Sequence, residues 1–517
     1  MSDDVTPRPA LGGPEPRRGA GTAARLVAGA AKVALVGAVG AGVVLAAERL
    51  PEVSLASPPS STASEQGAEP PAAATSYCPG APLSGTEGVE DVTVRSAFTA
   101  VQPDGDTLEA LVPGIAADGS LRIEELGEPE PLASKAGPMV EVDGQTGDKA
   151  IRVGGTDRGA VALTGAQEWF TSSDTVRGIG SLSCAAPTTD AWLIAGGNAP
   201  GRQERLLLTN PGANPVEVDI TVLGQKGPVT SDNAQPTTVP SGGRTSVLID
   251  AVGGVDTTPV VRVESRGGLV ASALTDVWTD GLVPAGVDSV GASADPAESL
   301  MLPTGSSLAG STVRVAVPGE RDGVVRLRAV TSSGTTTLTS TVTTVPAGSV
   351  RDIRLPSSLT DARAIEVVAD VPVVAAAEVT RRTTPGAPRD FAWASAAPGI
   401  GRLAGAAFTN GLPKGDLTTQ RTLTLTAQAE DARVEVITRT PSGVDTVTRE
   451  LTAGTAGSWA LPEGVQGVWV RPVSGEGVVR GAVLTTVGTQ DSASLVTSRV
   501  LRPLRLTDRD VPVHRAP

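Results

Sequence analysis

The chain repeats a pattern of strand, turn and strand along most of its length. Three copies begin at Arg205, Ser311 and Arg421. Apolar and polar residues alternate within them, as in Val313–Val317, and this period of two places one face of a strand on a core and the other in solvent. Turns that contain glycine or proline separate the strands, so the pattern predicts β-hairpins.

A second repeated pattern follows these hairpins and contains a tryptophan in three of its four copies. In the first two copies, Trp169 lines up with Trp278 within one position, and in a looser third copy we place Trp393 at the equivalent position. The fourth copy has no tryptophan. The copies occupy residues 158–197, 266–305, 371–401 and 476–487.

The repeats predict an all-β chain with several cores. A chain of 517 residues is too long for a single hydrophobic core. Hydrophobic residues make up 40% of it but aromatic residues only 2%, which is typical of small strands joined by frequent turns. A tandem array of roughly four immunoglobulin-like β-sandwich units fits the strand spacing better than a propeller with blades of about 40–50 residues.

An apolar segment precedes the repeats. Leu26–Ala47 carries one charged residue, Lys32, and as a helix would extend about 33 Å, enough to cross a bilayer core. Basic residues before it are expected to keep the N-terminus in the cytoplasm, so the rest of the chain is extracytoplasmic. The alternative is a secretory signal cleaved near Ala47, which would make the protein secreted.

These observations predict the following organisation. The chain begins with a cytoplasmic tail, followed by a transmembrane helix or signal anchor and by a disordered linker rich in Pro, Ser and Ala. Four β-domains and a short tail follow the linker. The predicted ranges are 1–25, 26–47 and 48–75 for the first three parts, 76–190, 191–300, 301–403 and 404–505 for the β-domains, and 506–517 for the tail.

The chain has two cysteines, Cys78 and Cys184. In an exported protein, a single pair with nothing left over is most simply a disulfide. It would brace the first β-domain, next to the linker.

The order of features resembles an uncharacterised actinobacterial family of envelope proteins, a domain-of-unknown-function family with N-terminal anchors. The resemblance rests on the basic N-terminus, the apolar segment, the linker, the opening Cys78-Pro79-Gly80 and the sequence LTNPG at Leu208–Gly212. It implies an extracytoplasmic address and gives no activity or site residues.

Several kinds of chemistry are disfavoured. The net charge of −14 argues against a nucleic-acid partner, and the lone His514 in the tail argues against a catalytic triad or a His-based zinc site. Gly305–Gly310 only approximates a nucleophile elbow. Asp104 and Asp106, with Glu109, form either a solvated turn or a calcium site. We therefore predict no catalytic, cofactor-binding or metal-binding residue.

The repeated tryptophans leave two interpretations open. Trp169, Trp278 and Trp393 either pack beneath loops or form stacking platforms for a ligand. The expected function is that of a non-catalytic, membrane-anchored scaffold or adaptor in bacterial cell-envelope assembly, with envelope proteins or wall polymers as partners. The alternative is a carbohydrate-binding or carbohydrate-active wall protein that uses the tryptophans.

Overall fold

The computed structural model describes residues 70–197, 199–229, 236–253, 258–305, 308–382, 389–413, 417–489 and 492–507. They belong to one compact unit that extends from Ala68 onward. The predicted cytoplasmic tail, the apolar segment and most of the predicted linker lie outside these residues. Most of the predicted C-terminal tail, including His514, also lies outside them. No helix within the described ranges is long and apolar enough to cross a membrane.

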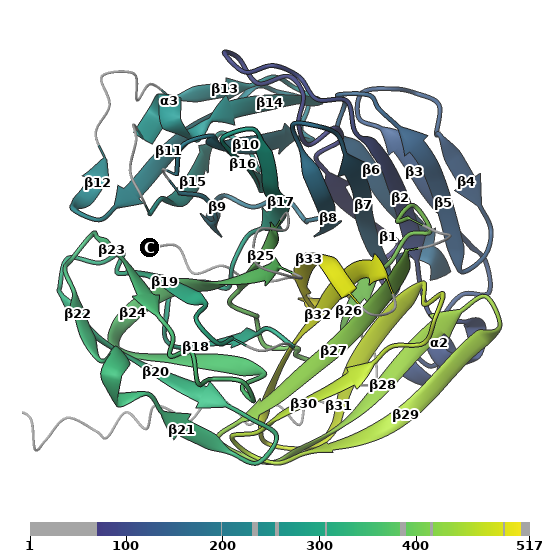
Figure 1. Ribbon diagram of the computed structural model, residues 1–517. Coiled ribbons are helices and arrows are strands. Elements are labelled where there is room, and N and C mark those ends of the chain that lie inside the picture. Colours follow the sequence, from purple (N-terminus) through teal and green to yellow (C-terminus); the bar gives the residue numbers. More distant parts are fainter. Residues whose placement is uncertain are drawn as a thin grey trace, which may run out of the picture. The chain divides into compact units, whose positions relative to one another are not determined.

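The described residues form an all-β fold, as predicted, with four consecutive segments, three of which contain a pair of sheets and one of which contains a single larger sheet (Figure 1). In the first segment, one sheet has the strand order β1-β6-β3-β4 and the other β5-β2-β7-β8. The bounds are β1 Ala73–Cys78, β2 Arg95–Val101, β3 Gly119–Glu125, β4 Ala133–Lys135, β5 Met139–Gln145, β6 Ile151–Asp157, β7 Thr164–Ser172 and β8 Arg177–Ser183, with the helix α2 at Gly105–Leu111 and a 3-10 turn at Arg158–Ala160.

The second segment repeats this topology, with the sheets β12-β11-β15-β9 and β14-β10-β16-β17. A short strand, β13, also pairs with β11. The bounds are β9 Asp190–Ile194, β10 Arg202–Asn210, β11 Val216–Gly224, β12 Gly227–Val229, β13 Thr237–Val239, β14 Gly243–Leu248, β15 Val260–Arg266, β16 Ala271–Asp280 and β17 Val283–Gly291, with α3 at Ile249–Gly253.

The third segment differs because one long strand, β24, belongs to both of its layers. Its first half pairs with β18 and β20, and its second half pairs with β19 and β25. The second segment divides the same path into β15 and β16 at Gly267 and Gly268. The bounds are β18 Ala297–Pro303, β19 Thr312–Ala316, β20 Gly323–Val330, β21 Thr335–Thr337, β22 Thr343–Val345, β23 Val350–Arg354, β24 Ala364–Arg382 and β25 Arg389–Ser395, with a 3-10 turn at Thr339–Thr341.

The fourth segment returns to two separate sheets, β29-β28-β31-β26-β34 and β30-β27-β32-β33. Strands β28 and β29 form one hairpin of this segment and β32 and β33 form another. The bounds are β26 Ala404–Ala407, β27 Thr418–Gln428, β28 Ala432–Thr440, β29 Gly443–Leu451, β30 Ala456–Ala460, β31 Gly467–Gly475, β32 Val478–Thr489, β33 Ser492–Val500 and β34 Arg502–Pro503.

Hydrophobic cores extend across the borders between segments. One core combines Leu206 and Val263 of the second segment with Val374 and Trp393 of the third. Another combines buried residues of the first segment, such as Val101, with Trp469 of the fourth. Because apolar burial is the main source of stability, the segments stabilise one another.

Two local predictions need correction. Strand β1 begins at Ala73, within the predicted linker, because its backbone pairs with β6 although its composition resembles that of the linker. Asp104 is the N-cap of α2, and its side chain accepts a hydrogen bond from the Thr107 amide at 3.0 Å. The described residues contain no group of three or more His, Cys, Asp or Glu side chains arranged to hold a metal ion.

The LTNPG sequence forms the turn between β10 and β11. The buried Asn210 side chain donates to the Asn214 carbonyl at 2.8 Å and accepts from the Gly212 amide at 2.8 Å. A buried amide that is satisfied on both sides fixes the turn, so this motif is explained by structure alone.

Candidate functional site at the meeting point of the four segments

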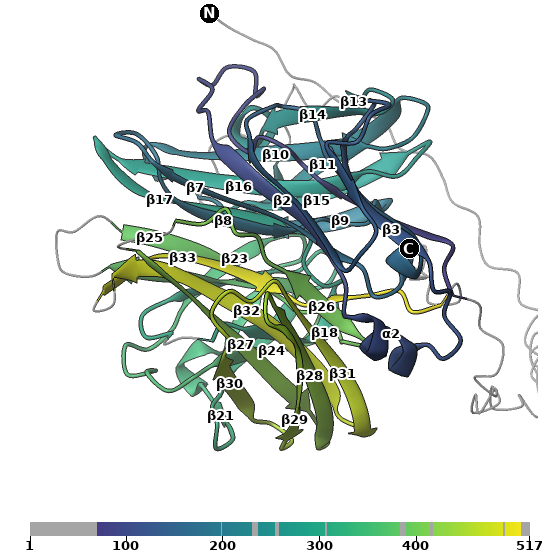
Figure 2. The same ribbon diagram turned by 90° about the vertical axis from the view of Figure 1, so that its right-hand side faces the viewer.

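The last long strand of each segment meets the last long strands of its neighbours; in the fourth segment this is β33, which precedes the two-residue β34. Strand β17 contacts β8 and β25, and β33 contacts β25 and β8, as Figure 2 shows from the side. The contacts therefore form a closed cycle in which the first segment lies against the fourth. The predicted tandem array did not include contact between its two ends, and the structure corrects it in this respect.

Two buried aspartates join three of these strands. Asp288 of β17 accepts hydrogen bonds from the Trp393 amide of β25 at 2.7 Å and from the Thr497 hydroxyl of β33 at 2.8 Å. Asp390 of β25 accepts from the Val287 amide at 3.3 Å and the Val496 amide at 2.8 Å. Burial raises the pKa of both carboxyl groups well above the usual value.

Glu168 of β7 joins the first segment to the fourth. Its carboxylate accepts from the Thr409 amide at 2.9 Å and from Arg421 of β27 at 3.0 Å, and it lies 3.6 Å from Arg499 of β33. Burial alone would raise its pKa, but the two guanidinium groups and the hydrogen bonds from Thr409 and Ser181 outweigh burial, so the pKa is lowered. The carboxylate is therefore charged in the folded protein.

Asp276 of β16 has the corresponding role between the second and third segments. Arg202 donates to both of its oxygens, at 2.8 and 2.6 Å, and the Trp393 indole of the third segment donates at 2.9 Å. Arg202 also donates to Glu378 of β24 at 3.2 Å. The neighbouring Glu204 is buried, and this burial, together with the charge of Asp276, raises its pKa to about 8.

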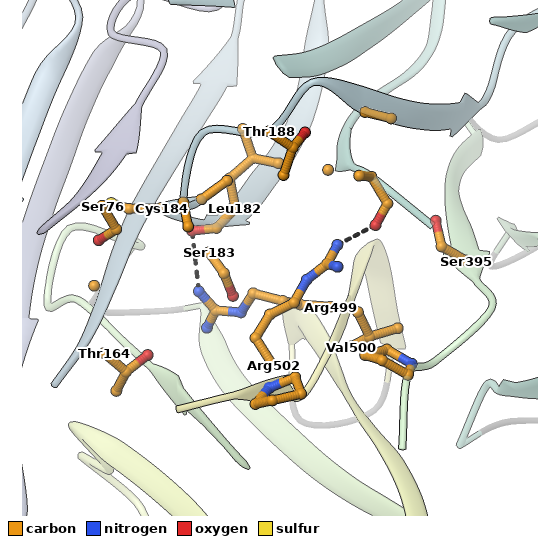
Figure 3. A pocket seen from close by; sticks show the side chains of 18 of the residues that line it. Ser76, Thr164, Leu182, Ser183, Cys184, Thr188, Ser395, Arg499, Val500 and Arg502 are labelled. Carbon is orange, nitrogen blue, oxygen red and sulfur yellow. Dashed lines mark hydrogen bonds between the residues drawn. The ribbon is translucent and has the colours of Figure 1, made fainter. Parts of the chain in front are cut away.

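A cavity of about 400 Å³ lies where the four segments meet (Figure 3). Its wall comes from the ends of the last strands and the connections that follow them, at Ser181–Ala186, Ser289–Asp295, Ser395 and Ser498–Val500. Residues Arg502–Arg505 complete it on one side. Small apolar and hydroxyl side chains predominate, so the lining resembles that of a small-molecule site with a few placed polar groups.

Three arginines line this cavity. Arg499 donates to the carbonyl oxygens of Leu182, at 3.3 Å, and Ala407, and Arg502 donates to the Ala292 carbonyl. Burial lowers the pKa of Arg499 and of Arg502 to about 10, so both remain cationic near neutral pH. Arg505 is the third.

The structure separates the predicted tryptophans. Trp169 on β7 lies opposite Gly180 and Trp278 on β16 lies opposite Gly286, whereas Trp393 is on the last strand, β25. The predicted equivalence of Trp393 is therefore wrong, because β24 continues without a break and the connection to β25 is longer. Trp169 is 0% exposed and Trp393 is 1% exposed, which favours packing for these two, and Trp278 is half-buried.

The cysteine prediction is confirmed. Cys78 at the end of β1 and Cys184 just after β8 form a disulfide. It joins the two sheets of the first segment beside the cavity wall, to which Cys184 also contributes.

Sequence reasoning missed the buried carboxylates Glu168, Asp276, Asp288 and Asp390, all 0% exposed. A signal was present for Glu168 and Asp288, each the one charged residue of its strand, whereas Asp276 and Asp390 share their strands with a second charged residue. Such a residue is buried only where hydrogen bonds or opposite charges compensate for the lost hydration.

Comparisons with known proteins give a family and no activity. No curated protein matches the chain. The structure of a glycoside hydrolase family 32 protein from Bifidobacterium adolescentis aligns with 9% identity over 82% of this chain and 95% of the other, but the TM-score is 0.13, a value too low to relate the two folds. The model of a family of unknown function, DUF5719, matches residues 140–462. The chain belongs to this family of unknown function.

Proposed function

We propose that the protein is a non-catalytic scaffold or adaptor of the bacterial cell envelope, anchored in the membrane by residues 26–47 with its β-segments outside the cytoplasm. Its partners would be envelope proteins or wall polymers. The observation that carries the proposal is the closed cycle of segments, which includes the hydrogen bonds from Arg421 and Thr409 of the fourth segment to Glu168 of the first. A closed cycle holds loops from distant parts of the chain in fixed positions, as a scaffold requires.

The buried carboxylates support a structural role. Glu168, Asp276, Asp288 and Asp390 are closed to solvent and accept hydrogen bonds from neighbouring segments. A general acid or base must reach its substrate, and these four groups face protein partners instead.

The disulfide supports the extracytoplasmic address. Disulfides persist in oxidising compartments and are rare in the bacterial cytoplasm. The bond between Cys78 and Cys184 therefore fits a chain whose β-segments are exported.

The carbohydrate alternative has less support. Burial of Trp169 and Trp393 leaves Trp278 as the remaining candidate platform. The guanidinium of Arg389 lies 3.3 Å from the centre of the Trp278 ring, where a sugar would have to stack.

A candidate contact surface is the tip of the β16–β17 hairpin. Leu282 is 93% exposed and the adjacent Val283 is 50% exposed, an unusual placement for two apolar side chains at one loop tip. Exposed apolar residues of this kind commonly mark interaction sites.

Site-specific crosslinking in cells tests the proposal. A photoreactive amino acid would replace Leu282 in the tagged full-length protein, and the matched control would replace Ser442, exposed in the β28–β29 turn. We expect mass spectrometry to recover a reproducible envelope protein or wall polymer from Leu282 and not from Ser442. Recovery of membrane lipid alone, or of the same products from both positions, would contradict the proposal.

A further inference from the structure

We propose that the central cavity binds a small amphiphilic anion, with one carboxylate or phosphate head group and an apolar body. This inference rests on the cavity itself and is independent of the scaffold role. A volume of about 400 Å³ lies within the range of natural small-molecule sites.

The first supporting observation is a set of buried polar groups without partners. Ser293 and Ser498 are among the residues that line the cavity, both are 7% exposed, and neither buried hydroxyl has a hydrogen-bond partner among the described residues. The Nε atom of Arg499 is also buried without a hydrogen-bond partner among the described residues. Leaving a buried polar group unsatisfied costs about 1–3 kcal/mol, so a ligand that accepts these hydrogen bonds gains affinity.

The second observation is the charge of the wall. Arg505 lines the cavity, and its guanidinium has no ion pair or hydrogen bond with any residue that the structure describes. Two carboxylates also line the cavity: Asp190 is held by Arg262 at 3.1 and 2.9 Å, and Asp295 interacts electrostatically with the buried Arg502. An acidic head group placed beside Arg505 would therefore meet an available cation, and charge-assisted hydrogen bonds to guanidinium are strong.

The third observation is the apolar part of the wall, which determines the body of the ligand. Leu163, Ala191, Val290 and Val500 line the cavity, and the wall contains a single aromatic residue among those described, Trp393. Sugars and nucleobases bind through stacking and many hydrogen bonds, whereas an alkyl body needs only apolar contact. The lining thus favours an alkyl or similar aliphatic body.

Calorimetry of the full-length protein, kept in solution by a non-ionic amphipathic polymer, tests this site. The probes are dodecanoate and dodecyl phosphate, which separate a fatty acid from a lipid phosphate, with dodecanol and dodecyltrimethylammonium as neutral and cationic controls, all below micellar concentration. We expect one or both anions to bind at a single site, and the two controls to bind at least about tenfold more weakly.

Two variants locate the site. Arg505→Gln should weaken anion binding about tenfold or more, and the matched control Arg433→Gln, which changes an exposed side chain of β28 in the fourth segment, should leave it unchanged. Ser183→Leu replaces a half-buried serine of the wall and should block binding by filling the cavity. A thermal unfolding transition shows whether Ser183→Leu is folded. If Ser183→Leu does not fold, the loss of anion binding in Arg505→Gln alone tests the site. Binding of neither anion, equal binding of dodecanol, or equal loss in Arg433→Gln and Arg505→Gln would overturn the proposal.

Discussion

The carboxylate of Glu168 lies 3.0 Å from the guanidinium of Arg421, although 253 residues separate them in the chain. Glu168 is in the first segment and Arg421 is in the fourth, so this buried ion pair spans the junction that closes the cycle. Around it, Thr409 donates from its amide and Arg499 lies close by. Glu168, the one charged residue of β7, therefore contributes a buried ion pair to the closure.

Substitution of Glu168 by Ala should destabilise the protein strongly. It leaves the buried guanidinium groups of Arg421 and Arg499 without their carboxylate, and breaking a buried pair from one side costs about 3–5 kcal/mol. Urea unfolding measures the loss. The control Glu435→Ala removes a half-exposed pair with Arg471 and should cost less than about 1 kcal/mol; equal effects would contradict the assigned role of Glu168.

Substitution of Gly180 by Ala should also be destabilising. An added Cβ would overlap the buried Trp169 indole that lies opposite it, and overpacking of a core costs about 1–3 kcal/mol. Gly319 is a matched control, because an added Cβ there has no heavy atom within 4 Å. Thermal unfolding should separate the two variants, and a Gly180→Ala protein as stable as Gly319→Ala would count against the packing of Trp169.

Removal of the disulfide should lower the free energy of unfolding. The double variant Cys78→Ser, Cys184→Ser opens a link between residues 106 positions apart, and the chain-entropy relation gives about 4–5 kcal/mol for a loop of this size. The difference in urea midpoint between wild type and variant should disappear when both are measured in reductant. A difference that persists in reductant would show that the serines, rather than the lost bond, cause the effect.

Stability should depend on pH through Glu204. Burial and the charge of Asp276 raise its pKa from 4.5 to about 8 in the folded protein, so between these values the folded chain holds a proton that the unfolded chain has released. The free energy of unfolding therefore falls as pH rises from about 4.5 to about 8 and changes no further from this group above that.

The variant Glu204→Gln should lose this dependence, since its carbonyl oxygen can still accept from the Gly197 amide, now 2.7 Å from the carboxylate. The free energy of unfolding of the variant, relative to that of wild type, should rise by on the order of a few kcal/mol from pH 5 to pH 9. Glu450→Gln, at a residue whose side chain is 75% exposed, serves as the control. Parallel stability curves for wild type and Glu204→Gln would refute the assignment.

The sequence predicted the strands well and the closure poorly, for physical reasons. Alternation of apolar residues, as in Val313–Val317, reports which face of a strand is buried, so the all-β fold could be read directly. The pair of Cys78 and Cys184 followed from counting. Contact between the first and fourth segments includes the pair of Glu168 and Arg421, and two charged residues so far apart in the chain carry no local pattern that links them.

The cavity was also beyond the reach of sequence reasoning. Its wall takes residues from the end of each segment, among them Ser183, Ser293, Ser395 and Ser498, and isolated serines at or near the ends of strands are common. These serines line one cavity only because the closed cycle brings four distant chain positions together. The tryptophans illustrate the opposite error, since a pattern suggested equivalence for Trp393 that strand pairing does not support.

Hydrogen–deuterium exchange of the full-length protein tests the closure most directly. In the closed cycle, the Thr409 amide donates to Glu168 and the Ala162 amide donates to the Arg505 carbonyl, so peptides that contain Thr409 and Ala162 should exchange as slowly as central strands. Glu168→Ala should accelerate exchange in both peptides together, in the first and the fourth segment. Rapid exchange of both in wild type, or an effect of Glu168→Ala confined to the first segment, would contradict a closed cycle of four segments.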